Sequence, residues 1–195
     1  YPERVGIVDE PDQVAPSWDS ITYGEVGARA RAMAAKLDAL GIGRGERVGI
    51  VSHNSARLAT AFFGVSGFGR VLVPINFRLS PPEVAYIVKH SGCRVLYVDP
   101  EISDSLHSVE CEHKFVIGDD DDLLLTGVEP APWEADEAAT ATINYTSGTT
   151  ARPKGVQITH RNIHSNAEAM FIGAQYDVDK DVMVSWLPCF HDMGM

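Results

Sequence analysis

Short apolar runs alternate with amphipathic stretches through the N-terminal half of the chain. The runs 47–52, 71–75 and 94–99 are almost wholly apolar, as strands buried on both faces are. Between them, apolar residues recur three and four positions apart, which predicts helices. Further short strands are expected at 5–9 and 114–118. Strands and helices in this rhythm predict an α/β fold with a doubly wound, largely parallel sheet flanked by helices.

The expected helices carry local start and stop signals. Ser or Thr followed three residues later by Glu forms a capping box, and glycine commonly ends a helix. A helix over 56–69 begins after the polar pair Asn54-Ser55, and another runs from Thr159 or His160 to about Gly173. The capping boxes are Thr22/Glu25 and Ser80/Glu83, and the stop glycines are Gly41 and Gly92.

Two strand-like stretches, 140–145 and 156–159, flank the segment 146–155. Apolar and polar residues alternate on both sides of that segment, which predicts that it joins two strands and does not open a helix. A further strand is expected over Asp181–Leu187, where apolar residues dominate again.

The segment Tyr145–Gly155 concentrates hydroxyl side chains, glycines and one lysine. Glycines let backbone N–H groups approach a ligand closely, and hydroxyls can donate hydrogen bonds to anionic oxygens. A lysine adds a point charge suited to phosphate. The residues predict a cradle for a polyphosphate, most simply ATP. The candidate binding residues are Thr146, Ser147, Gly148, Thr149, Thr150, Lys154 and Gly155.

Two other interpretations of this segment are weaker. A Walker A loop requires G-x-x-x-x-G-K-[ST] opening into a helix, whereas here the lysine precedes the second glycine and a strand-like stretch follows. That counts against a P-loop kinase or ATPase. A generic Ser/Thr/Gly surface loop seldom ends in Pro-Lys-Gly, as this one does at Pro153–Gly155.

Composition narrows the class of protein. The 195 residues are 45% hydrophobic and 22% charged, which is ordinary for a soluble globular protein and suits one domain or two closely packed subdomains. A net charge of −11 argues against nucleic acid as a partner. Three cysteines without metal-ligand spacing favour reduced thiols in the cytoplasm, and no apolar run approaches the ~20 residues of a membrane span.

Two polar clusters have simpler explanations than metal binding. The run Asp119–Asp122 could bind a hard cation, but a solvated loop is favoured. His160 and His164 lie four apart on an expected helix, without the glutamate of HExxH or a third ligand, so a capping or surface role is favoured.

The segment YTSGTTARPKG, followed by VQITHRN, resembles the phosphate loop of the adenylate-forming superfamily, which includes acyl-CoA synthetases and fatty acyl-AMP ligases. The resemblance extends from Pro2 to Met195, and Ala151 stands where the usual pattern has Gly. It implies that residues 1–195 are the N-terminal portion of an AMP-binding domain. The remainder of that domain and a small C-terminal domain are expected to be absent, because the chain starts without Met and stops inside a motif.

The resemblance implies a two-step reaction. A carboxylic acid, in many members a fatty acid, reacts with ATP to give acyl-AMP, with Mg²⁺ sharing the phosphate charge near Thr150. A Pro-x-Phe-His segment at this distance lines the acyl-binding region in the family. Pro188–His191 matches it, which implies a catalytic role for His191.

The acceptor of the acyl group stays open. Residues 74–99 resemble fatty-acyl-CoA ligases, which favours CoA, whereas His191–Gly194 is more similar to fatty acyl-AMP ligases that load a carrier protein. A catalytically silent nucleotide-binding fragment is a further alternative.

Overall fold

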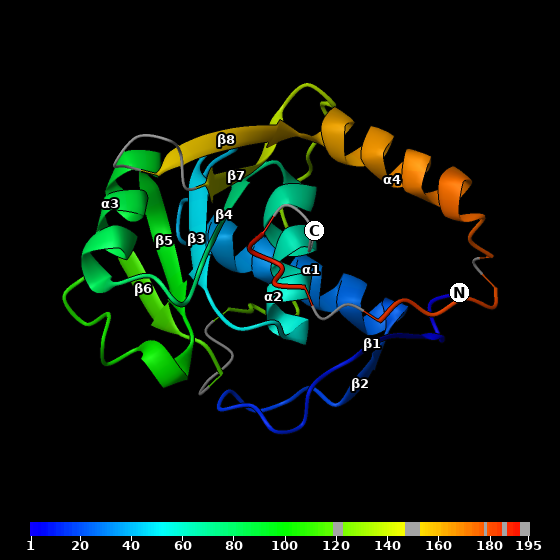
Figure 1. Cartoon of the computed structure of the whole chain (residues 1–195), viewed down its shortest axis with the longest axis horizontal. Coiled ribbons are helices and arrows are strands. Elements are labelled where there is room, and N and C mark those ends of the chain that lie inside the picture. The colour runs from blue at the N-terminus through cyan, green and yellow to red at the C-terminus, as the bar shows by residue number, and fades with distance from the viewer. Residues whose placement is uncertain (119–122, 147–152, 178, 185–186, 192–195) are drawn as a thin grey trace.

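The fold is built on one six-stranded sheet (Figure 1). The computed structural model describes residues 1–118, 123–146, 153–177, 179–184 and 187–191. The strand order is β6-β5-β3-β4-β7-β8, with parallel pairing throughout except that β8 runs antiparallel to β7. The strands are β3 (Arg47–Val51), β4 (Val71–Ile75), β5 (Cys93–Val98), β6 (His113–Val116), β7 (Thr140–Thr146) and β8 (Lys154–Thr159).

The remaining elements surround this sheet. Two short strands, β1 (Val5–Val8) and β2 (Ser20–Thr22), form a separate antiparallel pair. The α-helices are α1 (Tyr23–Ala39), α2 (Ala56–Val65), α3 (Pro81–Ser91) and α4 (His160–Ala174), and two 3₁₀ turns are η1 (Ser66–Phe68) and η2 (Pro100–Ile102).

Alternate residues of each central strand face opposite layers of helices. In β5, Val95 and Tyr97 point into the core that α1 and α2 cover. Their neighbours Leu96 and Val98 point into the core that α3 covers. Figure 1 shows α1 and α2 on one side of the sheet and α3 on the other. The period of two along the strands therefore divides the buried residues between two faces, and the predicted doubly wound sheet is confirmed.

The local helix signals are largely confirmed. Both predicted capping boxes form at the starts of α1 and α3, and α4 begins with a third box, between Thr159 and Asn162. Gly92 ends α3 at φ +68°, a left-handed conformation that favours glycine. For α2, only the second residue of the polar pair caps the helix, because the Ser55 hydroxyl accepts the Leu58 N–H.

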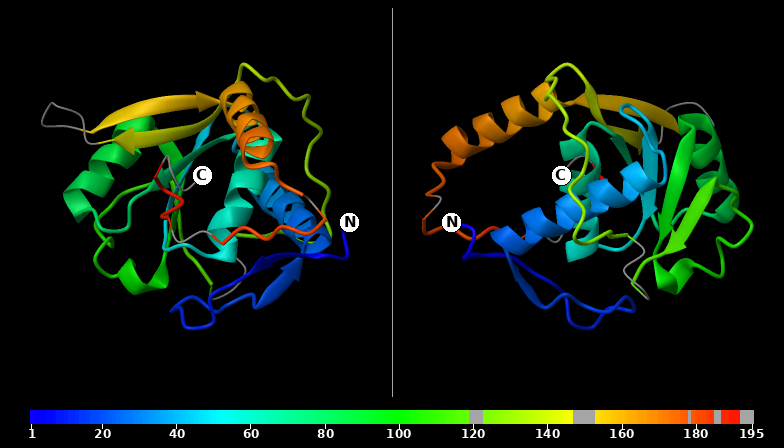
Figure 2. Two further views of the ribbon diagram at one scale, coloured as in Figure 1. Left: turned by 45° about the vertical axis from the view of Figure 1, so that its right-hand side comes forward. Right: turned by 180° about the vertical axis from the view of Figure 1, so that it is seen from behind.

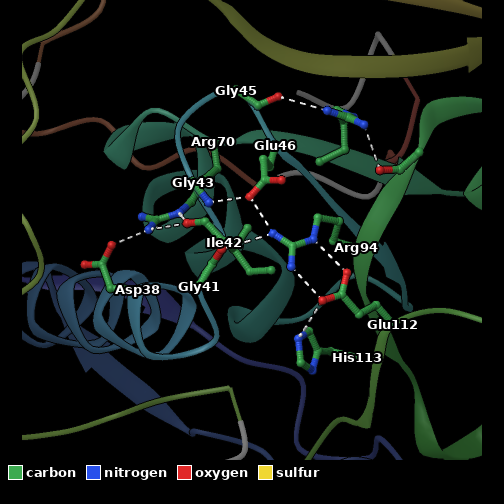
Figure 3. Close-up of polar contacts among 12 residues, drawn as sticks. Asp38, Gly41, Ile42, Gly43, Gly45, Glu46, Arg70, Arg94, Glu112 and His113 are labelled. Carbon is green, nitrogen blue, oxygen red and sulfur yellow. Dashed lines mark hydrogen bonds and ion pairs between the residues drawn. The ribbon is translucent and has the colours of Figure 1, made fainter.

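Arginines tie the loops together at the amino ends of the parallel strands (Figure 3). The Nε and Nη2 atoms of Arg94 donate to the two carboxylate oxygens of Glu112, at 2.7 and 2.6 Å, and Nη1 donates to Glu46 at 2.8 Å. The fully buried Arg70 donates to the Ile42 carbonyl oxygen and to the carboxylate of Asp38. These contacts hold together the loops at the amino ends of the strands, on the opposite side of the sheet from the strands' carboxyl ends.

The strand predicted over Asp181–Leu187 is wrong for the residues that the structure describes. Residues 181–184 have no regular secondary structure, and 185–186 lie outside the described residues. Val182 and Val184 are 85% and 77% exposed, so this apolar run has neither a neighbouring strand nor a core to pack on. Apolar composition alone does not make a strand without a partner for its backbone groups.

None of the helices found among the described residues has the length and apolar character needed to cross a membrane. Cys93, Cys111 and Cys189 are all free thiols.

Candidate functional site

Strands β7 and β8 form the hairpin that carries the candidate phosphate motif. Tyr145 pairs with Gly155 and Thr146 with Lys154, so the motif's two ends lie opposite each other. A Cβ on Gly155 would lie 2.9 Å from Cγ2 of Ile143 and 3.2 Å from Cζ of Tyr145. Glycine is needed at position 155 because side chains of the facing strand already occupy the space that a Cβ would take.

The hairpin brings together the predicted phosphate-binding residues that the structure describes, which are Thr146, Lys154 and Gly155. Thr146 and Lys154 are both exposed, at the end of the hairpin where the motif begins and ends. The two strands confirm the predicted strand–loop–strand arrangement, and helix α4 begins only at His160, which excludes the Walker A geometry. The predicted binding residues Ser147, Gly148, Thr149 and Thr150 lie outside the described residues.

Helix α3 contacts β7 and the residue that directly precedes β8. His90 contacts the hydroxyl of Tyr145 in β7, and Tyr86 contacts the Pro153 carbonyl just before β8. Neither α3 residue was expected from sequence to have a role at the site. No local signal could have found them, since the His90–Tyr145 pair spans 55 positions of the chain.

His191 lies in a different place, at the carboxyl ends of the parallel strands. Its segment is held by Asn54, whose side chain donates to the Leu187 carbonyl at 2.8 Å and accepts from the Cys189 N–H at 2.9 Å. The ring of Phe190 meets Phe77 edge-on, with centroids 5.7 Å apart. Asn54, the first residue of the polar pair expected to cap α2, thus positions the segment that carries His191, while Ser55 caps the helix.

A cavity of about 460 Å³ opens beside that segment. It is lined by residues that directly follow β3, β4 and β5, among them His53, Phe77, Arg78 and Glu101, together with Pro188. The helices that follow β3 and β4 pack on opposite faces of the sheet, so the cavity lies at a topological switch point, where α/β proteins commonly bind ligands.

The polar groups of this cavity are already paired in part. The Nε2 atom of His53 lies 3.0 Å from a carboxylate oxygen of Glu101, and its ring packs against Phe77 with centroids 3.8 Å apart and an interplanar angle of 38°. The buried carboxylate of Asp99 accepts from the Ser52 hydroxyl and the His53 N–H. A second cavity, of about 490 Å³, lies beside Tyr1 and Tyr23, and none of the predicted site residues lines it.

Metal ligands do not gather in the described part of the chain. No group of three or more His, Cys, Asp or Glu side chains there could hold a metal ion. Thr159 caps α4, while His160 packs against Trp133 with ring centroids 5.4 Å apart. Thr150, the residue assigned to Mg²⁺, and the run Asp119–Asp122 lie outside the described residues.

Comparison with known proteins identifies the family of the whole chain. The model of the AMP-binding enzyme family matches residues 1–195. The chain belongs to this family. It is 38% identical over 185 residues to the long-chain-fatty-acid–CoA ligase of Thermus thermophilus, covering 87% of this chain and 34% of that protein. It is 32% identical over 191 residues to the 3-methylmercaptopropionyl-CoA ligase of Ruegeria lacuscaerulensis, covering 87% and 35%.

The fold agrees with solved structures of the same kind. The ATP-bound structure of MatB from Rhodopseudomonas palustris superposes with a TM-score of 0.78 at 27% identity, covering 90% of this chain and 37% of that one. The chain spans about a third of the length of the curated relatives it matches.

Proposed function

We propose that the protein containing this chain uses ATP to convert a carboxylic acid to an acyl-AMP and then transfers the acyl group to CoA. The observation that carries the proposal is the β7–β8 hairpin, which places Thr146 and Lys154 opposite each other at the ends of the phosphate motif. The named relatives, CoA ligases for different acids, support the reaction class. A fatty acid is the proposed substrate.

The residues of the hairpin suit the triphosphate end of ATP. The exposed ammonium of Lys154 would bind oxygens of the β- and γ-phosphates, and the Thr146 hydroxyl would donate to the same groups. The substrate carboxylate attacks the α-phosphorus, the bond to the β-phosphate breaks, and pyrophosphate leaves. Stabilising that leaving charge is the part of the reaction assigned to these residues. We also propose that the hydroxyl of Thr150 would lie near Mg²⁺, which would neutralise part of the phosphate charge when bound.

The second step requires a thiol. The CoA thiol gives up its proton to solvent, its sulfur attacks the acyl carbonyl, and AMP leaves with the electrons of the acyl–phosphate bond. His191 is the proposed residue near the reacting carboxylate. The position of its segment beside the cavity at the carboxyl ends of the strands supports that role.

The experiment supplies the full-length protein with ATP, Mg²⁺ and a panel of carboxylic acids of different length. We expect acid-dependent exchange of pyrophosphate into ATP, and acyl-CoA when CoA is added. The absence of exchange with every acid would refute acid activation. Acyl-AMP that CoA cannot discharge, while a carrier-protein thiol can, would replace CoA by a carrier protein as the acceptor.

A further inference from the structure

Helix α3 holds the β7–β8 hairpin on both sides of the phosphate motif. Nδ1 of His90 lies 2.7 Å from the hydroxyl oxygen of Tyr145, which directly precedes Thr146. The hydroxyl of Tyr86 donates to the carbonyl oxygen of Pro153 at 3.4 Å. One helix therefore contacts the end of β7 at Tyr145 and the residue that directly precedes β8 at Pro153.

The rings around the first contact restrain one another. Tyr86 and His90 lie one turn apart on α3, and their rings stack with centroids 5.2 Å apart and an interplanar angle of 25°. The ring of Tyr145 meets His90 edge-on at 5.8 Å, and it lies close to Gly155, where a Cβ would be 3.2 Å from its Cζ. The tyrosine is thus fixed between α3 and the facing strand.

The hydroxyl of Tyr145 is protonated where it meets His90. Burial raises the pKa of Tyr145 to about 12, and the nearby Cys93 and Tyr86 act in the same direction. The phenol therefore keeps its proton at neutral pH. Because a phenol hydroxyl both donates and accepts, it can pair with Nδ1 of His90 in either imidazole tautomer.

We propose that His90 and Tyr86 are positioning residues that hold the hairpin ready for ATP. By fixing β7 through Tyr145 and the chain just before β8 through Pro153, they keep Thr146 and Lys154 at a constant separation before the nucleotide arrives. We call the contacts of His90 with Tyr145 and of Tyr86 with Pro153 the brace. Preformed geometry reduces the entropy lost on binding, so the brace contributes to ATP affinity without touching the reacting atoms. The role assigned to ATP rests on the proposed function.

The kinetic test uses the full-length protein with His90→Phe, Tyr145→Phe and the double variant. His90→Phe keeps a stacking ring but removes Nδ1, and Tyr145→Phe removes only the hydroxyl. Losing one hydrogen bond should raise KM for ATP about 3- to 10-fold in pyrophosphate exchange, with kcat within about twofold. The double variant should be no worse than either single one, because both remove the same contact. His90→Asn, whose amide can occupy the position of Nδ1, should restore part of the loss.

The controls are His107→Phe and Tyr23→Phe, two exposed positions outside the hairpin. Both should leave KM for ATP unchanged. Hydrogen exchange gives a readout independent of activity, since the amides of β7 and β8 should exchange faster in the brace variants than in the controls.

If His90→Phe and Tyr145→Phe change neither KM for ATP nor the hydrogen exchange of the β7 and β8 amides, the proposed positioning role is wrong. Loss of kcat and thermal stability with KM for ATP unaltered would also overturn it, because that pattern marks a general structural role. If the unmodified protein lacks acid-dependent exchange, the proposed function fails, while hydrogen exchange still decides whether α3 holds the hairpin.

Discussion

Lys154 is the residue whose role can be tested most directly. It is exposed at the first position of β8, opposite Thr146, so its removal should leave the core intact. In the full-length protein, Lys154→Ala should slow acyl-AMP formation by about 10- to 1,000-fold, the effect of losing one charge-stabilising contact. Pyrophosphate exchange measures the loss.

The matched control for this variant is Lys180→Ala, which removes another exposed lysine, one paired with Asp177 at 2.7 Å. The rate of pyrophosphate exchange by Lys180→Ala should equal that of the unmodified protein. An unchanged rate in Lys154→Ala would show that the motif's lysine does not act on the phosphates.

The carboxylates around Arg94 make stability depend on pH. Hydrogen bonds from Arg94 lower the pKa of Glu112, and the Gly43 N–H, followed by Arg94, lowers the pKa of Glu46. A lowered pKa in the folded state stabilises the protein above the ordinary glutamate pKa, and this contribution disappears as pH falls through the folded value. We expect Glu112→Gln to lower the urea midpoint at neutral pH and to differ little from the unmodified protein once the pH has fallen below the folded pKa of Glu112.

Glu110→Gln is the control, because it removes a carboxylate from an exposed position two residues away along the chain. Its urea midpoint should follow the unmodified protein at every pH. A Glu112→Gln deficit that persists unchanged in acid would show that the ion pair with Arg94 is not its cause.

At the scale of single residues, sequence identified chemistry more readily than contacts. The hydroxyls and lysine of the motif stand together in the chain, so Thr146 and Lys154 could be named in advance. The brace from His90 to Tyr145 could not, because its two residues meet only after α3 and β7 have packed against the same sheet.

Among the elements, the end of α3 offers a sharp test of packing. Gly92 has φ +68°, and a Cβ there would lie 2.5 Å from Nη2 of Arg47, whose side chain caps the helix by donating to the Ser91 and Gly92 carbonyls. Gly92→Ala should therefore lower the free energy of unfolding by about 1–3 kcal/mol, from backbone strain and displacement of the arginine.

The measurement is urea unfolding, with Gly67→Ala as the control. A Cβ added at Gly67 would meet no described atom within 4 Å, and the residue has no positive φ, so the same substitution should change stability little. Equal stability of the Gly92 variant and the unmodified protein would mean that Arg47 moves aside without loss.

Elements with local boundary signals were predictable, and elements that depend on distant partners were less so. The capping boxes and glycine stops located α1 and α3 closely. The order of the strands could not be derived, because β7 inserts beside β4 only after the chain has passed through β5 and β6. The expectation of a strand from 181 to 187 failed over 181–184 for the related reason that no neighbouring strand pairs with those residues.

On the scale of the whole molecule, the far edge of the sheet is uncovered. Helix α4 continues from β8 and extends away from the sheet (Figure 2), and none of its residues is buried. Large exposed apolar side chains gathered on one element commonly mark a contact with further protein. The large exposed side chains are Val156 in β8 and Ile163, Met170, Phe171 and Ile172 in α4.

We therefore expect the 195 residues alone to bind ATP weakly and to adenylate no acid. The chain spans about a third of its relatives, and catalysis requires several groups held together around the reacting atoms. With only the triphosphate end held, ATP affinity should be no better than roughly millimolar, about 4 kcal/mol of binding. The uncovered edge of β8 and α4 should also bind a hydrophobic dye and promote self-association.

The test compares pyrophosphate exchange by the purified 195-residue chain with exchange by the full-length protein, using the same acids. Calorimetric titration with ATP checks that the isolated chain binds the nucleotide weakly. Robust turnover by the isolated chain would show that the phosphate hairpin and the cavity at the carboxyl ends of the strands suffice for catalysis. The requirement for further protein around the reacting carboxylate would then be wrong.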